Sequence, residues 1–329
     1  MIDRNRLRSL REGEDARFTE LHPESAGFAG RARRSLLAGV PMPWMTRWPG
    51  SFPLFVDRAA GATLVDVDGH EYVDLCLGDT GAMTGHALPQ VTEALAERAS
   101  RGITTMLPAP DSGWVGEELT RRFRLPIWQL AMSATDANRF VLRYARALTG
   151  RPRIAVMDWC YHGTVDETLA VLDGDRVVPR PGGLGPQVDV ALTTAVVPFN
   201  DADALDRRLA EGDVACLLME PALTNIGIVL PEPGYLDAVR EITRRHGVLL
   251  VIDETHTLCA GPGGCTAAWD LEPDFVVMGK PIAGGIPAAA YGMSAEVAAR
   301  LTGPMLGHEI DVAGVGGTLT GSALATAAI

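Results

Sequence analysis

Short apolar runs that alternate with helical patterns fill most of the chain from about residue 128 onward. Six runs have the length of strands and are apolar almost throughout: 128–133, 153–157, 195–199, 214–219, 248–252 and 275–278. The segment after Ser133 has helical spacing, with Phe140, Val141 and Tyr144 on one face, and it ends at Gly150. Strands that are apolar on both faces and alternate with helices form a mainly parallel sheet with helices on both sides. The pattern therefore predicts an α/β fold.

The beginning of the chain follows a different pattern. Residues 1–50 are rich in arginine and then in proline and tryptophan, which predicts an N-terminal helix followed by an extended arm. Three short β-type runs come next: 53–57, 63–67 and 72–75. Asp68 and Gly69 between the last two are a hairpin turn signal. We therefore divide the chain into an arm and β-hairpin segment, residues 1–80, and a larger domain, residues 81–329.

The composition excludes several classes of protein. With 29 basic and 41 acidic residues the net charge is −12, which argues against nucleic acid as a partner. No apolar run reaches the roughly 18 residues that a membrane helix needs, and no signal peptide is visible at the start. The five cysteines are scattered without a Cys-x-x-Cys pair, which is typical of reduced thiols in the cytoplasm. A cytoplasmic protein without membrane or nucleic-acid partners is expected.

The basic residues are almost all arginine, with one exception. The chain has 28 arginines and a single lysine, Lys280. Arginine stays protonated, whereas the amine of a lysine can lose its proton and act as a nucleophile. The bias in codon usage explains the arginines, and Lys280 is a candidate for amine chemistry.

Three polar groups follow strands of the predicted sheet. Ser133, Ala134 and Thr135 come after the first strand and open a helix, Asp253 ends the fifth strand, and Lys280 follows the sixth. Ligands of open α/β sheets bind at this carboxyl edge, and a helix N-terminus there is a ready phosphate site. Each group also has a structural explanation, as a helix cap, an ion-pair partner or a surface lysine. Their common edge favours a binding site.

Other common catalytic motifs are missing. The sequence around Lys280 does not match the nucleotide-binding P-loop motif. Asp274 occupies the position of the first glycine of that motif, and Pro281 occupies the position that requires Ser or Thr. No G-x-S-x-G motif of a serine hydrolase and no H-E-x-x-H zinc motif occurs, and the seven histidines are dispersed.

The ordered set of polar motifs resembles the class III pyridoxal-phosphate aminotransferases of fold type I, closest to the glutamate-1-semialdehyde aminomutase branch. The resemblance covers roughly residues 50–329. Its motifs are Asp66-Val-Asp-Gly-His-Glu-Tyr-Val-Asp74, Ser133-Ala-Thr-Asp-Ala-Asn138, Tyr161-His-Gly163, Glu220-Pro221, Asn225-Ile-Gly227, Asp253-Glu-Thr-His-Thr257, Gly279-Lys-Pro-Ile-Ala-Gly-Gly285 and Gly317-Thr318.

The resemblance implies a large domain with a seven-stranded, mainly parallel sheet that binds pyridoxal 5′-phosphate. Lys280 is then the amine that forms a Schiff base with the cofactor and afterwards carries a proton. Asp253 keeps the pyridine nitrogen protonated, so that the ring withdraws electrons. Tyr161 lies against the ring; its structural alternative is a packed core aromatic.

The resemblance also implies the rest of the site. The phosphate lies on Ser133, Ala134 and Thr135, while Thr318 reaches the phosphate of a second subunit, because the family builds its sites at a homodimer interface. Glu220 and Asn225 shape the substrate side, although a structural role is equally compatible with their positions. The remaining cofactor-binding candidates are His162, Thr255 and His256. No metal site is expected.

The chain departs from the family pattern at several positions. Ala134 replaces a glycine, and if its φ were positive this would cost on the order of 1 kcal/mol. Asp136 replaces Glu, and Thr255 replaces the valine that packs on the ring. After residue 321 the chain begins a helix and stops, so we expect a C-terminally truncated protein without the small domain of the family.

The expected function is transfer of an amino group between a small amino compound and a keto or aldehyde acceptor, or an aminomutase reaction. One alternative keeps the cofactor but catalyses racemisation or decarboxylation. Another is a truncated, non-catalytic protein that keeps the fold. The sequence leaves the donor, the acceptor and the stereochemistry open.

Overall fold

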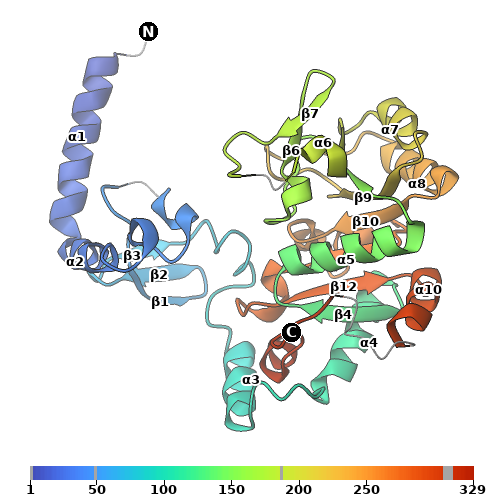
Figure 1. Cartoon of the computed structure of the whole chain (residues 1–329). Coiled ribbons are helices and arrows are strands. Elements are labelled where there is room, and N and C mark those ends of the chain that lie inside the picture. Colours follow the sequence, from blue (N-terminus) through green and yellow to red (C-terminus); the bar gives the residue numbers. More distant parts are fainter. Residues whose placement is uncertain (1–2, 48–49, 186–187, 307–313) are drawn as a thin grey trace. The chain divides into compact units, whose positions relative to one another are not determined.

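The computed structural model describes residues 3–47, 50–185, 188–306 and 314–329. The chain forms two compact units (Figure 1). The first comprises Met1–Asp79 and Thr84–Leu88, and the second comprises Thr80–Met83 and Pro89–Ile329. Within the described part of the chain, no helix combines the length and apolar content that a membrane crossing requires.

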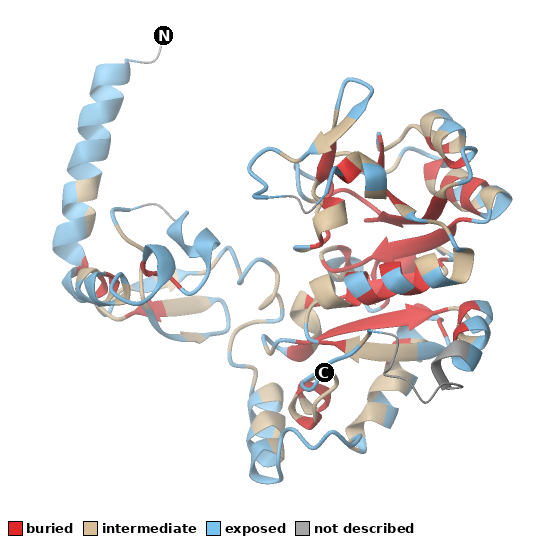
Figure 2. Cartoon of the chain, viewed as in Figure 1, coloured by how far each residue is buried: buried red, intermediate tan, exposed pale blue. Residues whose placement is uncertain are grey.

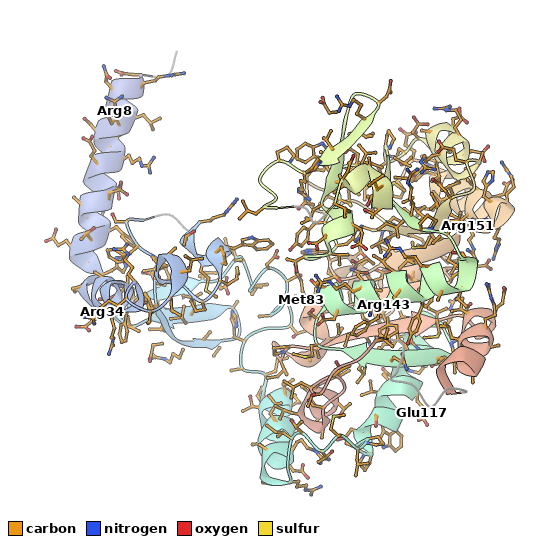
Figure 3. The ribbon with its side chains drawn as sticks, in the orientation of Figure 1. Arg8, Arg34, Met83, Glu117, Arg143 and Arg151 are labelled. Atoms are coloured by element: carbon orange, nitrogen blue, oxygen red, sulfur yellow. The ribbon has the colours of Figure 1, made fainter. Side chains whose placement is uncertain are left out.

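The first unit joins two helices to a small sheet. Helices α1 (Arg4–Leu21) and α2 (Pro23–Ala32) precede strands β1 (Val56–Ala60), β2 (Thr63–Asp66) and β3 (Glu71–Val73), which pair antiparallel in the order β1-β2-β3. No residue of α1 is buried, and exposed side chains such as that of Arg8 project from it (Figure 3).

The expectation of an extended arm before the sheet is wrong in part. The described residues of this stretch contain the helix α2 and two short 3₁₀ turns, η1 (Leu37–Gly39) and η2 (Pro43–Thr46). Pro23 and Pro43 each occupy the start of a helical turn, where proline has no amide hydrogen to lose and its φ is already helical.

The second unit is built on a seven-stranded sheet, which confirms the predicted fold class. The strands lie in the order β4-β12-β11-β10-β9-β5-β8. Their bounds are β4 (Ile127–Ala131), β5 (Arg153–Met157), β8 (Thr194–Val197), β9 (Val214–Met219), β10 (Leu249–Asp253), β11 (Phe275–Met278) and β12 (Ala289–Met293). Only β12 runs against its neighbours in this sheet. All six predicted strands are present, while β12 and the hairpin β6 (Ala170–Asp173) with β7 (Arg176–Pro179) were not predicted.

The second unit also contains helices. They are α3 (Pro89–Ser100), α4 (Asp111–Phe123), α5 (Ala134–Thr149), α6 (Val190–Thr193), α7 (Ala202–Leu209), α8 (Tyr235–His246), α9 (Gly264–Ala268), α10 (Ala295–Leu306) and α11 (Ala323–Ala328). Helix α5 crosses the sheet against β4, β9, β11 and β12 (Figure 1). Short 3₁₀ turns are η3 (Asp166–Thr168), η4 (Thr257–Ala260) and η5 (Lys280–Ala283).

Burial is concentrated in the central strands. Every residue of β9, β10, β11 and β12 is buried, as the red strands of Figure 2 show. Because these strands are apolar on both faces, the helices and loops on each side fix the sheet rigidly. The residues that follow the strand ends therefore start from well-defined positions.

Candidate active site

The carboxyl ends of the parallel strands bring the predicted polar residues to one edge of the sheet. Strand β10 pairs with β11 so that Asp253 lies opposite Val277, three residues before Lys280. On the other side β10 pairs with β9, and Ile252 lies opposite Met219, directly before Glu220. The register thus places a carboxylate and an amine on neighbouring strand ends.

Lys280 occupies an unusual backbone position. Its φ is +50°, in the left-handed region that a non-glycine residue rarely adopts, and such positions cluster at functional sites. The preceding Gly279 leaves little space, since a Cβ there would come within 3.0 Å of the Cβ of Ala134. The Nζ atom lies 2.7 Å from Nε2 of His256, whose Nδ1 is 3.5 Å from the hydroxyl of Thr80. The amine is therefore held beside an imidazole, and the backbone just before Lys280 packs against the first residue of α5.

Asp253 is a buried carboxylate with three hydrogen-bond donors. It is 3% exposed, and it accepts hydrogen bonds from the ring Nδ1 of His162 (2.9 Å), the amide of Asn138 (3.0 Å) and the backbone N–H of Thr255 (3.0 Å). Burial by itself raises the pKa of this carboxyl, but the hydrogen bond and charge of His162 and the other donors lower it below its usual value. Asp253 therefore stays ionised.

His162 is the charge partner of Asp253. Burial lowers the pKa of its ring, while Cys160 and the carboxylate of Asp253 raise it, and the net effect is a pKa well above the ordinary value. The two side chains form a buried ion pair at 2.9 Å. Sequence reasoning placed His162 near the cofactor but did not identify this pairing.

The N-terminus of α5 forms the third part of the site. The hydroxyl of Ser133 caps the helix by accepting from the backbone N–H of Asp136 (3.2 Å). Ala134 is the first helical residue and does not have positive φ. Replacing the family's glycine by alanine therefore causes no backbone strain at this position. Thr135 accepts from the backbone N–H of Thr164 through its Oγ1 (3.1 Å). The unpaired N–H groups of a first helical turn attract anions such as phosphate.

Three further candidates follow strands β9 and β5. Glu220 is 3% exposed, and its pKa is raised by burial, although nearby His162 and the hydrogen bonds from Thr224 counteract this. Asn225 is exposed and donates from its amide to the backbone oxygen of Trp159 (3.1 Å). Tyr161 is half-buried and follows β5 directly before His162.

One candidate lies apart from this group within the chain. Thr318 is exposed, in a turn closed by the hydrogen bond from Thr320 N–H to the Gly317 oxygen (3.0 Å). Conversely, two residues of the site were missed as candidates, Asn138 and Thr80. A polar Asn138 on the buried face of an amphipathic helix was a readable signal, whereas nothing in the sequence singles out Thr80.

Several buried polar atoms around Asp253 lack a partner within the chain. Four buried side-chain atoms among the described residues have no hydrogen bond, and three of them are Asn138 Oδ1, His162 Nε2 and Thr255 Oγ1. Buried polar groups are normally satisfied. Their clustering beside one carboxylate indicates a polar environment suited to a bound molecule.

The sequence profile of the family "Aminotransferase class-III" matches residues 44–329. The chain belongs to the class III aminotransferase family. The resemblance that the motifs indicated is thus confirmed.

Individual class III relatives are similar over most of the chain. The glutamate-1-semialdehyde 2,1-aminomutase of Myxococcus xanthus is 34% identical, over 93% of this chain and 71% of the relative. A glutamate-1-semialdehyde aminomutase from Pseudomonas aeruginosa superposes with a TM-score of 0.95 at 52% identity, over 99% of this chain and 73% of that one. An omega-transaminase from Sphaerobacter thermophilus superposes with a TM-score of 0.81 at 32% identity, over 92% and 70% of the two chains.

Pyridoxal 5′-phosphate is the cofactor of class III aminotransferases, and solved relatives include one with PLP bound and the Pseudomonas protein in complex with PMP. The residues of this chain fit the cofactor. The ionised Asp253 suits a protonated pyridine nitrogen, the α5 N-terminus suits a phosphate, and Lys280 supplies an amine for the aldehyde. The unsatisfied polar atoms around Asp253 support the same assignment.

Proposed function

We propose that this protein uses pyridoxal 5′-phosphate to move an amino group between a small amino compound and a keto or aldehyde carbon. The observation that carries this proposal is the pairing of β10 with β11, which puts the buried carboxylate of Asp253 and the amine of Lys280 at the same sheet edge. When bound, the cofactor supplies an aldehyde for the amine and a ring that accepts electrons from the substrate carbon.

Asp253 and its partners set the electrostatics at the ring end of the site. With its pKa lowered, Asp253 presents a negative charge that holds a proton on a facing pyridine nitrogen. His162 and Asn138 fix the orientation of the carboxylate through Oδ2. The charge of Asp253 is thus available without rearrangement, which is how preorganised sites stabilise developing charge.

Lys280 and His256 are the residues proposed to transfer a proton at the reacting carbon. A lysine amine near the reacting carbon can take a proton from one position and return it to another. His256 hydrogen-bonds this amine at 2.7 Å and orients it. Ser133, Ala134 and Thr135 would anchor the phosphate, Tyr161 would lie against the cofactor ring, and Glu220 and Asn225 would border the substrate.

An aminomutase reaction is the second candidate. It is supported by the 52% identity to the Pseudomonas protein named glutamate-1-semialdehyde aminomutase. An aminomutase moves the amino group within one molecule and needs no separate acceptor, whereas a transaminase requires one. Racemisation and decarboxylation move no amino group.

The primary experiment is borohydride reduction of the protein with pyridoxal phosphate, followed by peptide mass mapping. The expected adduct is on Lys280 and is absent in Lys280→Arg, which keeps the charge but cannot present a neutral amine. Folded protein that forms no adduct would overturn the proposal and support a non-catalytic homologue. Product analysis with glutamate-1-semialdehyde alone, and with an amine donor plus a keto acid, then separates aminomutase from transaminase.

We also propose a cytoplasmic homodimer. The five cysteines are all free thiols, which supports a reducing compartment. The exposed position of Thr318 supports a role at the site of a second subunit. Light scattering measures the assembly, and Thr318→Ala should weaken cofactor binding only if the two subunits share their sites.

A further inference from the structure

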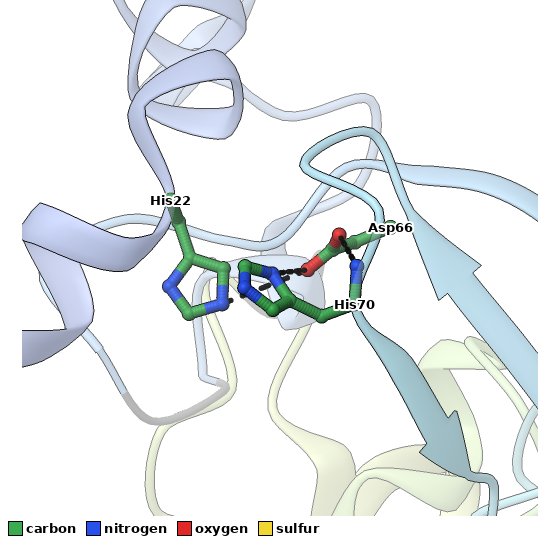
Figure 4. A group of neighbouring side chains, drawn as sticks. All are labelled: His22, Asp66 and His70. Atoms are coloured by element: carbon green, nitrogen blue, oxygen red, sulfur yellow. Dashed lines mark hydrogen bonds and ion pairs between the residues drawn. The ribbon is translucent and has the colours of Figure 1, made fainter.

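A compact histidine–carboxylate cluster lies in the first unit. His22 stands between α1 and α2, Asp66 ends β2, and His70 precedes β3 (Figure 4). Oδ2 of Asp66 is 3.2 Å from Nδ1 of His70 and 3.6 Å from Nε2 of His22. The three ligand-type atoms all lie within 4.8 Å of one another. The first described motif, Asp66 to Asp74, thus carries a feature that the amino-group chemistry does not use.

The ring of His22 is oriented by its surroundings. Its Nδ1 lies 2.7 Å from the backbone oxygen of Phe18, which can only accept, so Nδ1 carries a proton. The other ring nitrogen, Nε2, lies on the side of the cluster, 3.6 Å from Oδ2 of Asp66. The ring of Phe18 packs on it with a centroid distance of 4.4 Å. A histidine whose far nitrogen is fixed by a carbonyl is the usual arrangement of a metal ligand.

Tyr72 touches two members of the cluster. Its hydroxyl lies 2.8 Å from Oδ2 of Asp66 and 2.9 Å from Nε2 of His22. The other carboxylate oxygen of Asp66 is already bonded to the backbone N–H of His70 (2.8 Å).

We propose that His22, Asp66 and His70 bind a divalent transition-metal ion of the zinc class. Two imidazoles and one carboxylate are the ligand types that zinc, cobalt and nickel accept. Tetrahedral zinc with bonds of about 2.0–2.1 Å places neighbouring ligand atoms about 3.3 Å apart, close to the spacings around Oδ2 of Asp66. Tyr72 or a water takes the fourth position. Asp66 and His22 are buried, whereas the His70 ring is 38% exposed and gives the ion a way in.

The ion would tie the helices of the first unit to its sheet. α1 has no buried residue, and His22 follows directly after its last residue. The start of α2 is already fixed to the same hairpin, because Asp68 accepts hydrogen bonds from the backbone N–H groups of Glu24 (2.7 Å) and Ser25 (3.0 Å). The metal therefore completes a junction between the helices and the β2–β3 hairpin. This structural role is independent of the proposed function.

Zinc titration of the tag-free, full 329-residue chain by calorimetry tests the proposal. The expected result is one zinc ion per chain. His22→Gln and His70→Gln are each expected to weaken that binding by about 100-fold or more. His86→Gln is the matched control, because His86 contacts Asp74 at 2.7 Å in the same unit but has no second histidine beside it. Its zinc affinity should remain within about twofold of the wild type.

Cobalt(II) provides a second readout that does not depend on stability. Tetrahedral cobalt with nitrogen ligands gives visible absorption bands, which the wild type should show and His70→Gln should lose. This variant changes an exposed ring and keeps the backbone N–H that Asp66 accepts, so it should fold. A wild type that binds no zinc, or variants that bind it as tightly as the wild type, would overturn the proposal.

Discussion

Nζ of Lys280 lies 2.7 Å from Nε2 of His256, so the amine that is expected to react is already hydrogen-bonded to an imidazole. In this contact one nitrogen donates and the other accepts. His256, in the loop after β10, thus contacts Lys280, which follows β11. A change at His256 should alter how Lys280 handles protons without removing the amine.

We predict that His256→Gln lowers kcat by about 10- to 100-fold, because a positioned proton partner contributes on this scale. Cofactor affinity should change little, since Lys280 and Asp253 remain. The measurement is kcat and its pH profile in the wild type and the variant, with borohydride trapping to confirm that Lys280 still reacts. A profile of unchanged shape and height would show that His256 only fills space.

Thr80→Val is the matched control for His256. The hydroxyl of Thr80 lies 3.5 Å from Nδ1 of His256, the ring nitrogen opposite the one that contacts Lys280. If the ring acts through Nε2, this variant should retain most of the activity. An equal loss in both variants would instead mean that ring orientation, and not the contact with Lys280, limits the rate.

The buried pair of Asp253 and His162 should be strongly coupled. Removing one partner of a buried ion pair leaves the other charge without compensation and costs about 3–5 kcal/mol. We therefore expect Asp253→Asn and His162→Gln each to lower the free energy of unfolding of the cofactor-free protein. The double variant should lose about 1–3 kcal/mol less than the sum of the single losses. Urea unfolding measures all four proteins, and strict additivity would show that the pair is not coupled.

The same pair predicts how stability depends on pH. The pKa of His162 is raised in the folded protein, so its contribution is complete below the unfolded value of about 6.5 and is lost as the pH rises through the folded value. The pKa of Asp253 is lowered, so its contribution is lost only as the pH falls through that low value. Wild-type stability should therefore decline at alkaline pH.

His162→Gln isolates this effect. The variant has no ring to deprotonate, so the difference in unfolding free energy between wild type and variant should shrink from neutral to alkaline pH. Groups that do not interact with His162 are present in both proteins and cancel in this difference, whereas Cys160 interacts with the ring, so its effect is part of the measured difference. A difference that stays constant across this range would mean that His162 keeps its charge state.

Periodicity and motif order predicted the sheet well, for physical reasons that particular elements illustrate. Strands β9 and β10 are apolar on both faces, and only a covered parallel sheet accommodates such runs. β12 escaped prediction because three of its five residues, Ala289 to Met293, are alanine or glycine, and its burial comes from its neighbours. The β6–β7 hairpin was missed because its strands are only partly buried and include the exposed residues Asp173, Arg176 and Pro179, so neither is a continuous apolar run.

The site was predictable as a set of strand-end residues but not as a network of contacts. Asp253 and Lys280 follow from where their strands end. The contacts of Asp253 with Asn138 and His162 join residues 115 and 91 positions apart, and no local pattern encodes them. For the same reason the cluster of His22 with Asp66 could not be predicted. Here the residue types were visible and their proximity depended on the tertiary fold.

Gly163 tests whether close packing at the phosphate end is essential. Its φ is +78°, and an added Cβ would come within 2.1 Å of Oγ1 of Thr135, the hydroxyl that holds the backbone N–H of Thr164. Gly174, in the turn between β6 and β7, has φ +60° but open space around it. Gly174→Ala should cost only the backbone strain of about 1 kcal/mol, whereas Gly163→Ala should cost about 1–3 kcal/mol more through overpacking. Because Thr135 must move, Gly163→Ala should also weaken pyridoxal phosphate binding, which titration of the cofactor absorbance measures. Equal stability and cofactor affinity in the two variants would show that Thr135 relaxes freely and that the loop does not define the phosphate site.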